Sequence, residues 1–100
     1  MAKPYYADYV NHILRFYFRY ARNKGFKNEV DKLNYMAADK VIQRMSDSDR
    51  EALSLVFKQD GINFTDIVSA AAAQRGEEPS KIWSLISTAT TKVAKERRLL

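Results

Sequence analysis

Hydroxyl and basic side chains recur at helical spacing between residues 81 and 98. With a rotation of about 100° per residue, they share one side of a helix and its margins: Lys81, Ser84, Ser87, Thr88, Thr91, Lys92, Lys95 and Arg98. Hydroxyl groups and cationic heads are groups that contact the phosphate oxygens and base edges of nucleic acids. The pattern therefore predicts either a nucleic-acid-binding face or a helix face that is simply solvated.

Side chains that could support enzyme catalysis are few and poorly spaced. The 100-residue chain has no cysteine, which excludes thiolate catalysis, disulfide bonds and cysteine-ligated zinc. His12 is the single histidine, and the metal-binding spacing H-E-x-x-H is absent. No glycine-rich phosphate loop occurs, and the acidic pairs Asp47/Asp49 and Glu77/Glu78 lie where helices are predicted to start. We therefore expect no enzyme activity, no cofactor and no metal ion.

The charge of the chain is +5 overall and is unevenly distributed. Residues 1–28 carry a net charge of +5, residues 29–79 of −4 and residues 80–100 of +4. Cationic ends favour a polyanionic partner such as double-stranded DNA, although many basic domains bind no nucleic acid. No apolar run approaches the roughly 18 residues of a membrane span, and the first residues lack a signal-peptide core. We expect a soluble, cytoplasmic protein that does not bind membranes.

The first helix is predicted to follow Pro4 and to run to about Asn23. Its apolar stripe is wide and rich in aromatic side chains: Tyr6, Tyr9, Val10, Ile13, Leu14, Phe16, Tyr17, Tyr20 and Ala21. One neighbouring helix rarely covers so wide a stripe. The helix is therefore either wedged between two others or uses part of the stripe as an interface, namely Tyr6, Tyr9, Phe16 and Tyr17. On the opposite side, a basic ridge contacts either phosphate or the acidic middle of the chain: Arg15, Arg19 and Arg22.

A second helix is predicted over about Asn28–Met45, after a break at Asn23-Lys24-Gly25. Its apolar seam comprises Val30, Leu33, Ala37, Val41 and Met45, widened by Ala38 and Ile42. Ser48 with Glu51 three residues later has the spacing of a capping box at the start of a third helix. The inward face of that helix comprises Leu53, Val56 and Phe57, and Asp60-Gly61 ends it.

Clear boundary signals mark a fourth and a fifth helix. Asn63 can cap the fourth helix, Gly76 closes it, and Pro79 suits the first position of the fifth. The fourth helix has a slim buried face of Ile67, Val68, Ala71 and Ala72, and the fifth buries Ile82, Leu85, Ile86, Ala89 and Val93. The predicted fold is all-α, with five helices in a single domain over residues 1–100. Its last three helices have the proportions of a helix-turn-helix, whose final helix enters the major groove.

The segment Met45–Phe57 carries a specific resemblance. Met45-Ser46, then Arg50, Leu53, Leu55 and Phe57, resembles the opening of region four of bacterial sigma factors, L-S-x-x-x-R-x-V-L-x-L-R-F. Residues 63–68 (NFTDIV) resemble the S-Y-E-E-I-A segment of the next helix in that family. The spacing of Ile82, Ile86, Ala89 and Val93 is similar to the V-x-x-x-L-x-x-A-x-x-x-L pattern of its recognition helix. The match covers about residues 45–95, and the layout of the whole chain is similar to small phage late-gene transcription activators.

The resemblance implies a DNA-binding transcription regulator whose residues 46–100 form the helix-turn-helix and whose residues 1–45 form an aromatic-rich helical support. The last helix would dock in the major groove through Lys81, Ser84, Ser87, Thr88, Thr91, Lys95 and Arg98, with Lys92 and Arg75 at the margin. RNA polymerase is a further partner that the resemblance suggests. The alternative is a non-enzymatic protein-interaction module in which the aromatic first helix docks a partner or a second copy of the chain.

Two departures from the sigma pattern bear on this interpretation. About four additional residues separate Ile67 from Ile82, so the segment 70–78 lengthens either the helix or the turn. The recognition helix of the family is rich in arginine, whereas here Thr88, Thr90 and Thr91 occupy those places. Guanine contacts usually need arginine or lysine, so the resemblance predicts the fold more directly than it predicts promoter recognition.

Overall fold

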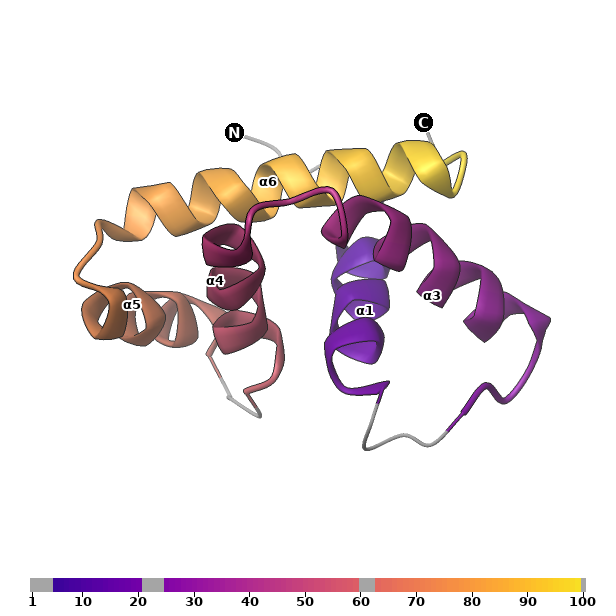
Figure 1. Ribbon diagram of the computed structural model, residues 1–100, viewed down its shortest axis with the longest axis horizontal. Coiled ribbons are helices and arrows are strands. Elements are labelled where there is room, and N and C mark those ends of the chain that lie inside the picture. The colour runs from indigo at the N-terminus through magenta and orange to yellow at the C-terminus, as the bar shows by residue number, and fades with distance from the viewer. Residues whose placement is uncertain (1–4, 21–24, 60–62, 100) are drawn as a thin grey trace.

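A long helix, α6 (Pro79–Glu96), runs along one side of the molecule, and the other helices pack beneath it (Figure 1). The computed structural model describes residues 5–20, 25–59 and 63–99, and these ranges contain five α-helices and no strand. The other four helices are α1 (Ala7–Phe18), α3 (Glu29–Ile42), α4 (Asp47–Phe57) and α5 (Phe64–Arg75). α6 packs against all four of them. The prediction of an all-α, five-helix fold is confirmed.

A single apolar core joins the five helices. Its fully buried members come from every helix and include Val10, Ile13 and Leu14 of α1, Ala38 of α3, Leu53 and Phe57 of α4, Val68 of α5, and Ile82 and Val93 of α6. Burial of a Val, Leu, Ile or Phe side chain stabilises a fold by roughly 1.5–3 kcal/mol. Because α6 contributes its whole aliphatic seam to this core, its position is fixed by packing along its entire length.

The first helix, α1, is wedged between other helices, which was one of the two arrangements expected from its wide apolar stripe. α1 contacts α3, α4 and α6, and the aromatic side chains near its C-terminal end are half-buried. The ring centroid of Tyr17 lies 5.0 Å from that of Tyr35, and Phe18 stacks on the buried Phe57 at 6.1 Å. The Tyr17 hydroxyl donates to a carboxylate oxygen of Asp39 at 2.8 Å. Burial, and then this hydrogen bond, raise the pKa of Tyr17 above its ordinary value.

The limits of α1 differ from the predicted ones. The helix begins at Ala7, three residues after Pro4, and it ends at Phe18 with Arg19 as its C-cap, earlier than predicted. Its predicted end at Asn23 lies outside the described residues, as do the predicted break at Asp60-Gly61 and the ridge residue Arg22. Gly25 has a positive φ of 116°, a backbone conformation that favours glycine.

The buried face of α3 is rotated from the predicted seam. Ala37, Ala38, Val41 and Ile42 are buried as expected, but Val30 and Leu33 are exposed and Met45 is only half-buried. Asn34 is buried instead, because its side-chain amide exchanges hydrogen bonds with the Tyr9 hydroxyl and accepts one from Arg97 Nε at 2.6 Å. The predicted seam was wrong at its N-terminal end because a polar residue, satisfied by distant partners, occupies the inner side.

The start of α4 also differs from the predicted capping box. Ser46, not Ser48, is the N-cap, and its hydroxyl accepts the backbone N–H of Asp49 at 3.1 Å. The helix therefore begins two residues earlier than predicted. Ser48 lies in the first turn of α4, where its hydroxyl accepts a hydrogen bond from Arg75 Nη2 at 2.7 Å. The inward residues Leu53, Val56 and Phe57 are buried as predicted.

Candidate nucleic-acid interface

The connection between α5 and α6 consists of three residues, 76–78. Asn63 caps α5 by accepting the backbone N–H groups of Thr65 and Asp66 at 2.9 and 3.4 Å, as predicted. At the other end, Gly76 ends the helix as predicted, and its backbone is left-handed, with φ 66° and ψ 35°. Pro79 is the first residue of α6, a position whose backbone N–H would have no hydrogen-bond partner within the helix, so the missing N–H of proline costs nothing there. Residues 70–75 therefore belong to α5, and only residues 76–78 form the turn before α6.

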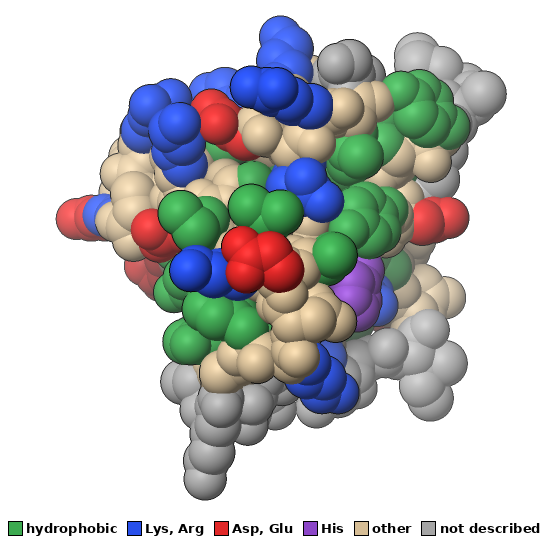
Figure 2. All heavy atoms as spheres, turned by 90° about the vertical axis from the view of Figure 1, so that its right-hand side faces the viewer, with side chains coloured by type: hydrophobic (Ala, Val, Ile, Leu, Met, Phe, Trp, Pro, Cys, Tyr) green, Lys and Arg blue, Asp and Glu red, His purple; other side chains and the backbone are tan. Residues whose placement is uncertain are grey.

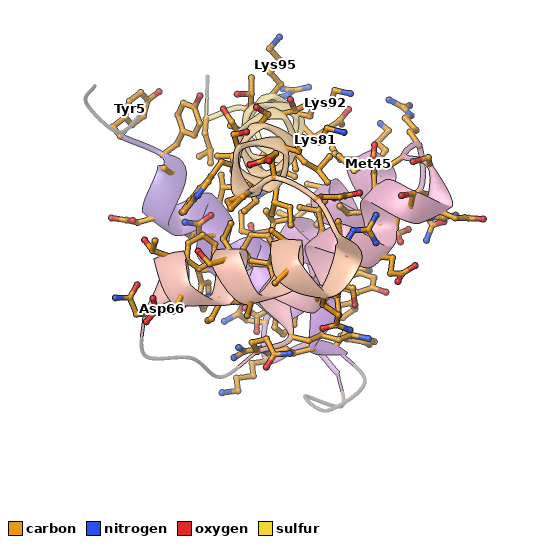
Figure 3. All side chains as sticks on the ribbon, turned by 90° about the vertical axis from the view of Figure 1, so that its left-hand side faces the viewer. Tyr5, Met45, Asp66, Lys81, Lys92 and Lys95 are labelled. Atoms are coloured by element: carbon orange, nitrogen blue, oxygen red, sulfur yellow. The ribbon has the colours of Figure 1, made fainter. Side chains whose placement is uncertain are left out.

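α6 has one buried face and one open face. Ile82, Ile86, Ala89 and Val93 are buried as predicted, and Leu85 is half-buried at the margin. In Figure 3, α6 is seen nearly end-on with α5 running across the view beneath it, and the side chains of Lys81, Lys92 and Lys95 extend away from the body of the protein. The side opposite the aliphatic seam is therefore uncovered by the other described helices.

The predicted contact residues of α6 lie on this open side. The exposed ones are Lys81, Ser84, Ser87, Thr88, Lys92, Lys95 and Arg98, and Thr91 is half-buried. We call these eight residues the α6 outer face. Thr90, one of the threonines aligned with arginine in the family pattern, is instead buried, with 7% of its surface exposed. It faces inward because its helical position lies beside the aliphatic seam and not opposite it.

Arg75 does not belong to the α6 outer face. Its guanidinium donates to Ser48 and lies 3.3 Å from a carboxylate oxygen of Glu77 and 3.6 Å from one of Glu51. Only 13% of this side chain is exposed. Because two carboxylates and a hydroxyl occupy its donors, Arg75 joins the end of α5 to the start of α4 and positions the turn before α6.

The C-terminal end of α6 presents one arginine outward and holds another inward. Arg97 donates to the buried Asn34 and is half-buried. Arg98 is exposed and has a left-handed backbone, with φ 59°. The next residue, Leu99, returns its N–H to the carbonyl of Ala94 at 2.8 Å, which completes a Schellman-type helix end. The basic residues at this end of α6 are therefore divided: Lys92, Lys95 and Arg98 point outward, and Arg97 is held inward.

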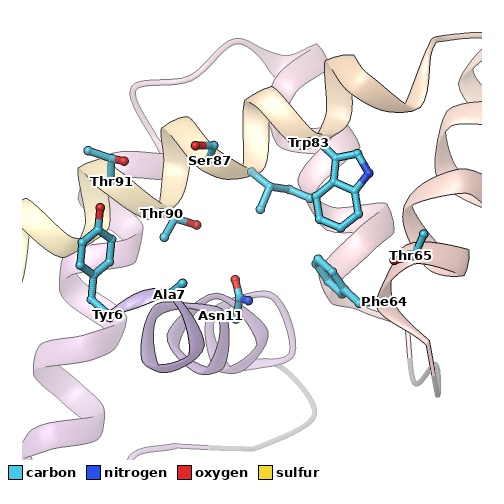
Figure 4. A pocket seen from close by; sticks show the side chains of 10 residues that line it. Tyr6, Ala7, Asn11, Phe64, Thr65, Trp83, Ser87, Thr90 and Thr91 are labelled. Carbon is cyan, nitrogen blue, oxygen red and sulfur yellow. The ribbon is translucent and has the colours of Figure 1, made fainter. Parts of the chain in front are cut away.

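A groove of about 380 Å³ runs beside the outer face, between α6 and the N-terminal ends of α1 and α5 (Figure 4). Aromatic rings of Tyr6, Phe64 and Trp83 line it, with the centroids of Phe64 and Trp83 5.5 Å apart in an edge-to-face arrangement. Ser87 and Thr91 belong both to this groove and to the α6 outer face. No charged residue is among the described residues that line it. The groove gives the outer face an apolar, hydroxyl-bearing margin on one side.

The described residues of the basic ridge of α1, Arg15 and Arg19, make contacts within the chain. Arg15 lies over the Phe64 ring, with its guanidinium carbon 5.7 Å from the ring centroid. Arg19 donates to the carbonyl oxygens of Phe57, at 3.0 Å, and Gln59, at the end of α4. Backbone carbonyls at a helix C-terminus attract a cation through the helix dipole. These hydrogen bonds join Arg19 to the C-terminal end of α4.

The aromatic residues proposed as an interface are mostly occupied within the chain. Tyr6 lines the groove, and the Tyr9 hydroxyl exchanges hydrogen bonds with Asn34. Phe16 lies among the rings of Tyr20 and Phe26, and Tyr17 packs on Tyr35. Only Tyr9 of the four candidates, Tyr6, Tyr9, Phe16 and Tyr17, is classed as exposed.

Sequence reasoning missed Asn34, Thr90 and the structural role of Arg75. A signal existed only for Thr90, which falls between Ile86 and Val93 at inward helical spacing. No group of three or more histidine, aspartate or glutamate side chains among the described residues could hold a metal ion. Within the same ranges, no helix is both long and apolar enough to cross a membrane.

No protein-family model matches the chain, and no curated protein sequence or solved structure is significantly similar to it. A functional assignment therefore depends on the geometry of α6 and its neighbours.

Proposed function

We propose that the chain is a non-enzymatic DNA-binding transcription regulator that docks α6 in the major groove of double-stranded DNA. The observation that supports this function is the division of α6 into a fully packed aliphatic seam and an open face of hydroxyl and basic side chains. A major groove about 12 Å wide accommodates a helix about 10–12 Å in diameter. The three-residue turn with a left-handed glycine is also typical of a helix-turn-helix.

The two halves of the α6 outer face have different proposed roles. In helix-turn-helix proteins, the N-terminal residues of the recognition helix contact base edges. We assign this role to Ser84, Ser87 and Thr88, whose hydroxyls both donate and accept hydrogen bonds. Lys92, Lys95 and Arg98 at the other end, with Lys81 at the margin, would contact phosphates. The sigma-factor resemblance adds transcription regulation, a link to phages and RNA polymerase as a partner, and the composition adds a cytoplasmic location; these remain proposals.

Salt dependence provides the most direct test. Each phosphate neutralised by a lysine contributes a slope of about −0.9 to the plot of log K against log salt concentration. A Lys81/Lys92/Lys95→Ala variant should therefore show a slope shallower by about 2.7 units. Over a fourfold rise in salt concentration, the affinity of the wild type should then fall roughly 40-fold more than that of the variant. Fluorescence anisotropy with labelled duplexes, both random and genomic, would measure it from about 50 to 200 mM salt.

A matched control removes the same charge from another surface. Lys27, Lys32 and Arg44 are exposed and lie outside α6. The Lys27/Lys32/Arg44→Ala variant should keep a slope close to that of the wild type. An equal decrease of the salt slope in both triple variants would show that net charge alone attracts the DNA. Absence of duplex binding by the wild type in low salt would overturn the proposal.

The alternative function, a protein-interaction module that docks through α1, has less support because Phe16 and Tyr17 pack within the chain. It makes a different prediction for the same material. A protein that shifts no duplex at any salt concentration, yet is retained by a polymerase subunit, would favour this alternative.

A further inference from the structure

The side of α3 that faces away from the core carries a row of large apolar side chains. Val30, Leu33 and Met36 are exposed over 49%, 44% and 55% of their surfaces. Figure 2 shows this end of the molecule, where hydrophobic side chains lie at the surface among charged ones. A helix that only meets water normally has polar residues on its outer side. The row therefore indicates a contact with another molecule.

A shallow groove adjoins this row. It has a volume of about 430 Å³ and lies between α3 and the C-terminal end of α6, where Leu33, Met36 and Ala37 meet Glu96 and Arg97. Apolar side chains of a partner could enter it beside Leu33 and Met36. The surface thus offers both protruding apolar groups and a hollow to receive them.

The charges at the two ends of the row are self-complementary. Glu29 lies four residues before Leu33, and Lys40 lies four residues after Met36, so the four residues follow one line along the helix. A two-fold axis midway between Leu33 and Met36 places Leu33 opposite the partner's Met36 and Glu29 opposite the partner's Lys40. A parallel pairing would instead juxtapose like charges at both ends. Lys40 lies 3.5 Å from Glu96 within the chain, but 58% of its side chain is exposed and two further N–H donors remain.

We propose that Glu29, Leu33, Met36 and Lys40, here called the α3 outer face, form an antiparallel contact with the same face of a second copy of the chain. Such an isologous contact closes as a dimer. The stretch from Glu29 to Lys40 is only about 16 Å long at 1.5 Å per residue. Stable interfaces usually bury about 1,200–2,000 Å², so the dimer should dissociate readily and its population should depend on protein concentration. None of these residues belongs to the α6 outer face, so the proposal does not depend on DNA binding.

Sedimentation velocity over a wide concentration range tests the dimer. The wild type should show a rise in weight-average sedimentation coefficient with concentration. Leu33→Glu and Met36→Glu should each remain monomeric, because each buries a carboxylate opposite an apolar side chain. Both positions are exposed and glutamate is a good helix former, so circular dichroism and thermal melting should match the wild type.

Charge exchange tests the antiparallel register. Glu29→Lys alone, or Lys40→Glu alone, places like charges together twice in the dimer and should raise its dissociation constant roughly tenfold or more. An equimolar mixture of the two variants restores both opposite-charge contacts and should associate more tightly than either variant alone. Glu78→Lys, at the distant start of α6, changes the net charge as Glu29→Lys does and should leave the dimer unchanged.

The possible results separate clearly. A wild type that is monomeric at every concentration overturns the proposal. A dimer that persists in Leu33→Glu, but is lost in Tyr9→Glu, assigns association to the α1 side and overturns it as well. A dimer that is sensitive to Leu33→Glu, with a mixture no tighter than the single variants, overturns the antiparallel pairing.

Discussion

One left-handed residue follows α5 and another follows α6, and the presence or absence of glycine at these positions should affect stability in opposite directions. Gly76 and Arg98 have φ values of 66° and 59°, and each precedes a residue that returns its N–H to a helix carbonyl. A side chain in this conformation costs roughly 1–2 kcal/mol, because Cβ crowds the backbone carbonyl. Glycine avoids this strain but loses more conformational entropy on folding. The substitutions Gly76→Ala and Arg98→Gly therefore act in opposite directions.

The structure sets the expected size of each effect. A Cβ added to Gly76 would meet no atom within 4 Å, so Gly76→Ala carries only the backbone penalty and should lower the free energy of unfolding by about 1 kcal/mol. Arg98→Gly should raise it by about 0.5–1 kcal/mol, since relief of strain is partly offset by the entropy of the unfolded chain. For a domain of this size, 1 kcal/mol corresponds to a melting shift of about 4–8 °C.

Urea titration followed by circular dichroism and Trp83 fluorescence would measure both changes, and duplex titration would measure the salt slope. Arg98→Gly should be more stable than the wild type and yet have a slope shallower by about 0.9, because one phosphate contact is lost. Lys95→Gly is the matched control: it removes the same charge from within α6 and should lower stability by about 1 kcal/mol. If Arg98→Gly and Lys95→Gly changed stability in the same direction, the strain attributed to Arg98 would be refuted.

Three further predictions follow from particular contacts. Ser46→Ala should lower the free energy of unfolding by about 1 kcal/mol in a urea titration, whereas Ser48→Ala should lower it by roughly half as much, because Ser48 is not the cap. Arg75→Ala should lower the free energy of unfolding by about 1–2 kcal/mol without changing the salt slope of DNA binding, because the guanidinium donors of Arg75 are used inside the protein. A shallower slope would instead show that Arg75 contacts DNA. Because the pKa of Tyr17 is raised in the folded state, the unfolded chain loses its proton first, so stability should fall as pH rises above about 10. Urea titrations across this range should show a weaker fall in Tyr17→Phe, and an equal fall would contradict the assignment.

The features predicted correctly from the sequence depend on neighbours along the chain. Asn63 caps α5 through N–H groups two and three residues away, and Gly76 and Pro79 act through their own backbone torsions. The aliphatic seam of α6 was equally predictable, because four of its members repeat with helical spacing and all are buried. Such signals are local, so they hold whatever the tertiary arrangement is.

The features that were mispredicted depend on residues distant in the sequence. Asn34 is buried because Tyr9 and Arg97 satisfy its amide, and this rotated the buried face of α3 away from Val30. Ser48 contacts Arg75, 27 positions away in the sequence, so the spacing between Ser48 and Glu51 did not identify the N-cap of α4. A local pattern cannot show which of two polar residues a distant partner will hold.

The chemistry of the α6 outer face limits how sharply a single copy could select a DNA sequence. Base discrimination of about 1–3 kcal/mol per contact usually comes from forked or bidentate side chains, whereas the N-terminal half of the α6 outer face has hydroxyls and Lys81. The binding energy of one copy would then come mainly from phosphate contacts, which do not depend on sequence. Two copies joined through the α3 outer face would add the discrimination of two sites, because dimers of this kind read paired half-sites. The weak selectivity expected of α6 and the proposed contact through the α3 outer face are therefore mutually consistent: pairing two copies would compensate for the limited base discrimination of one.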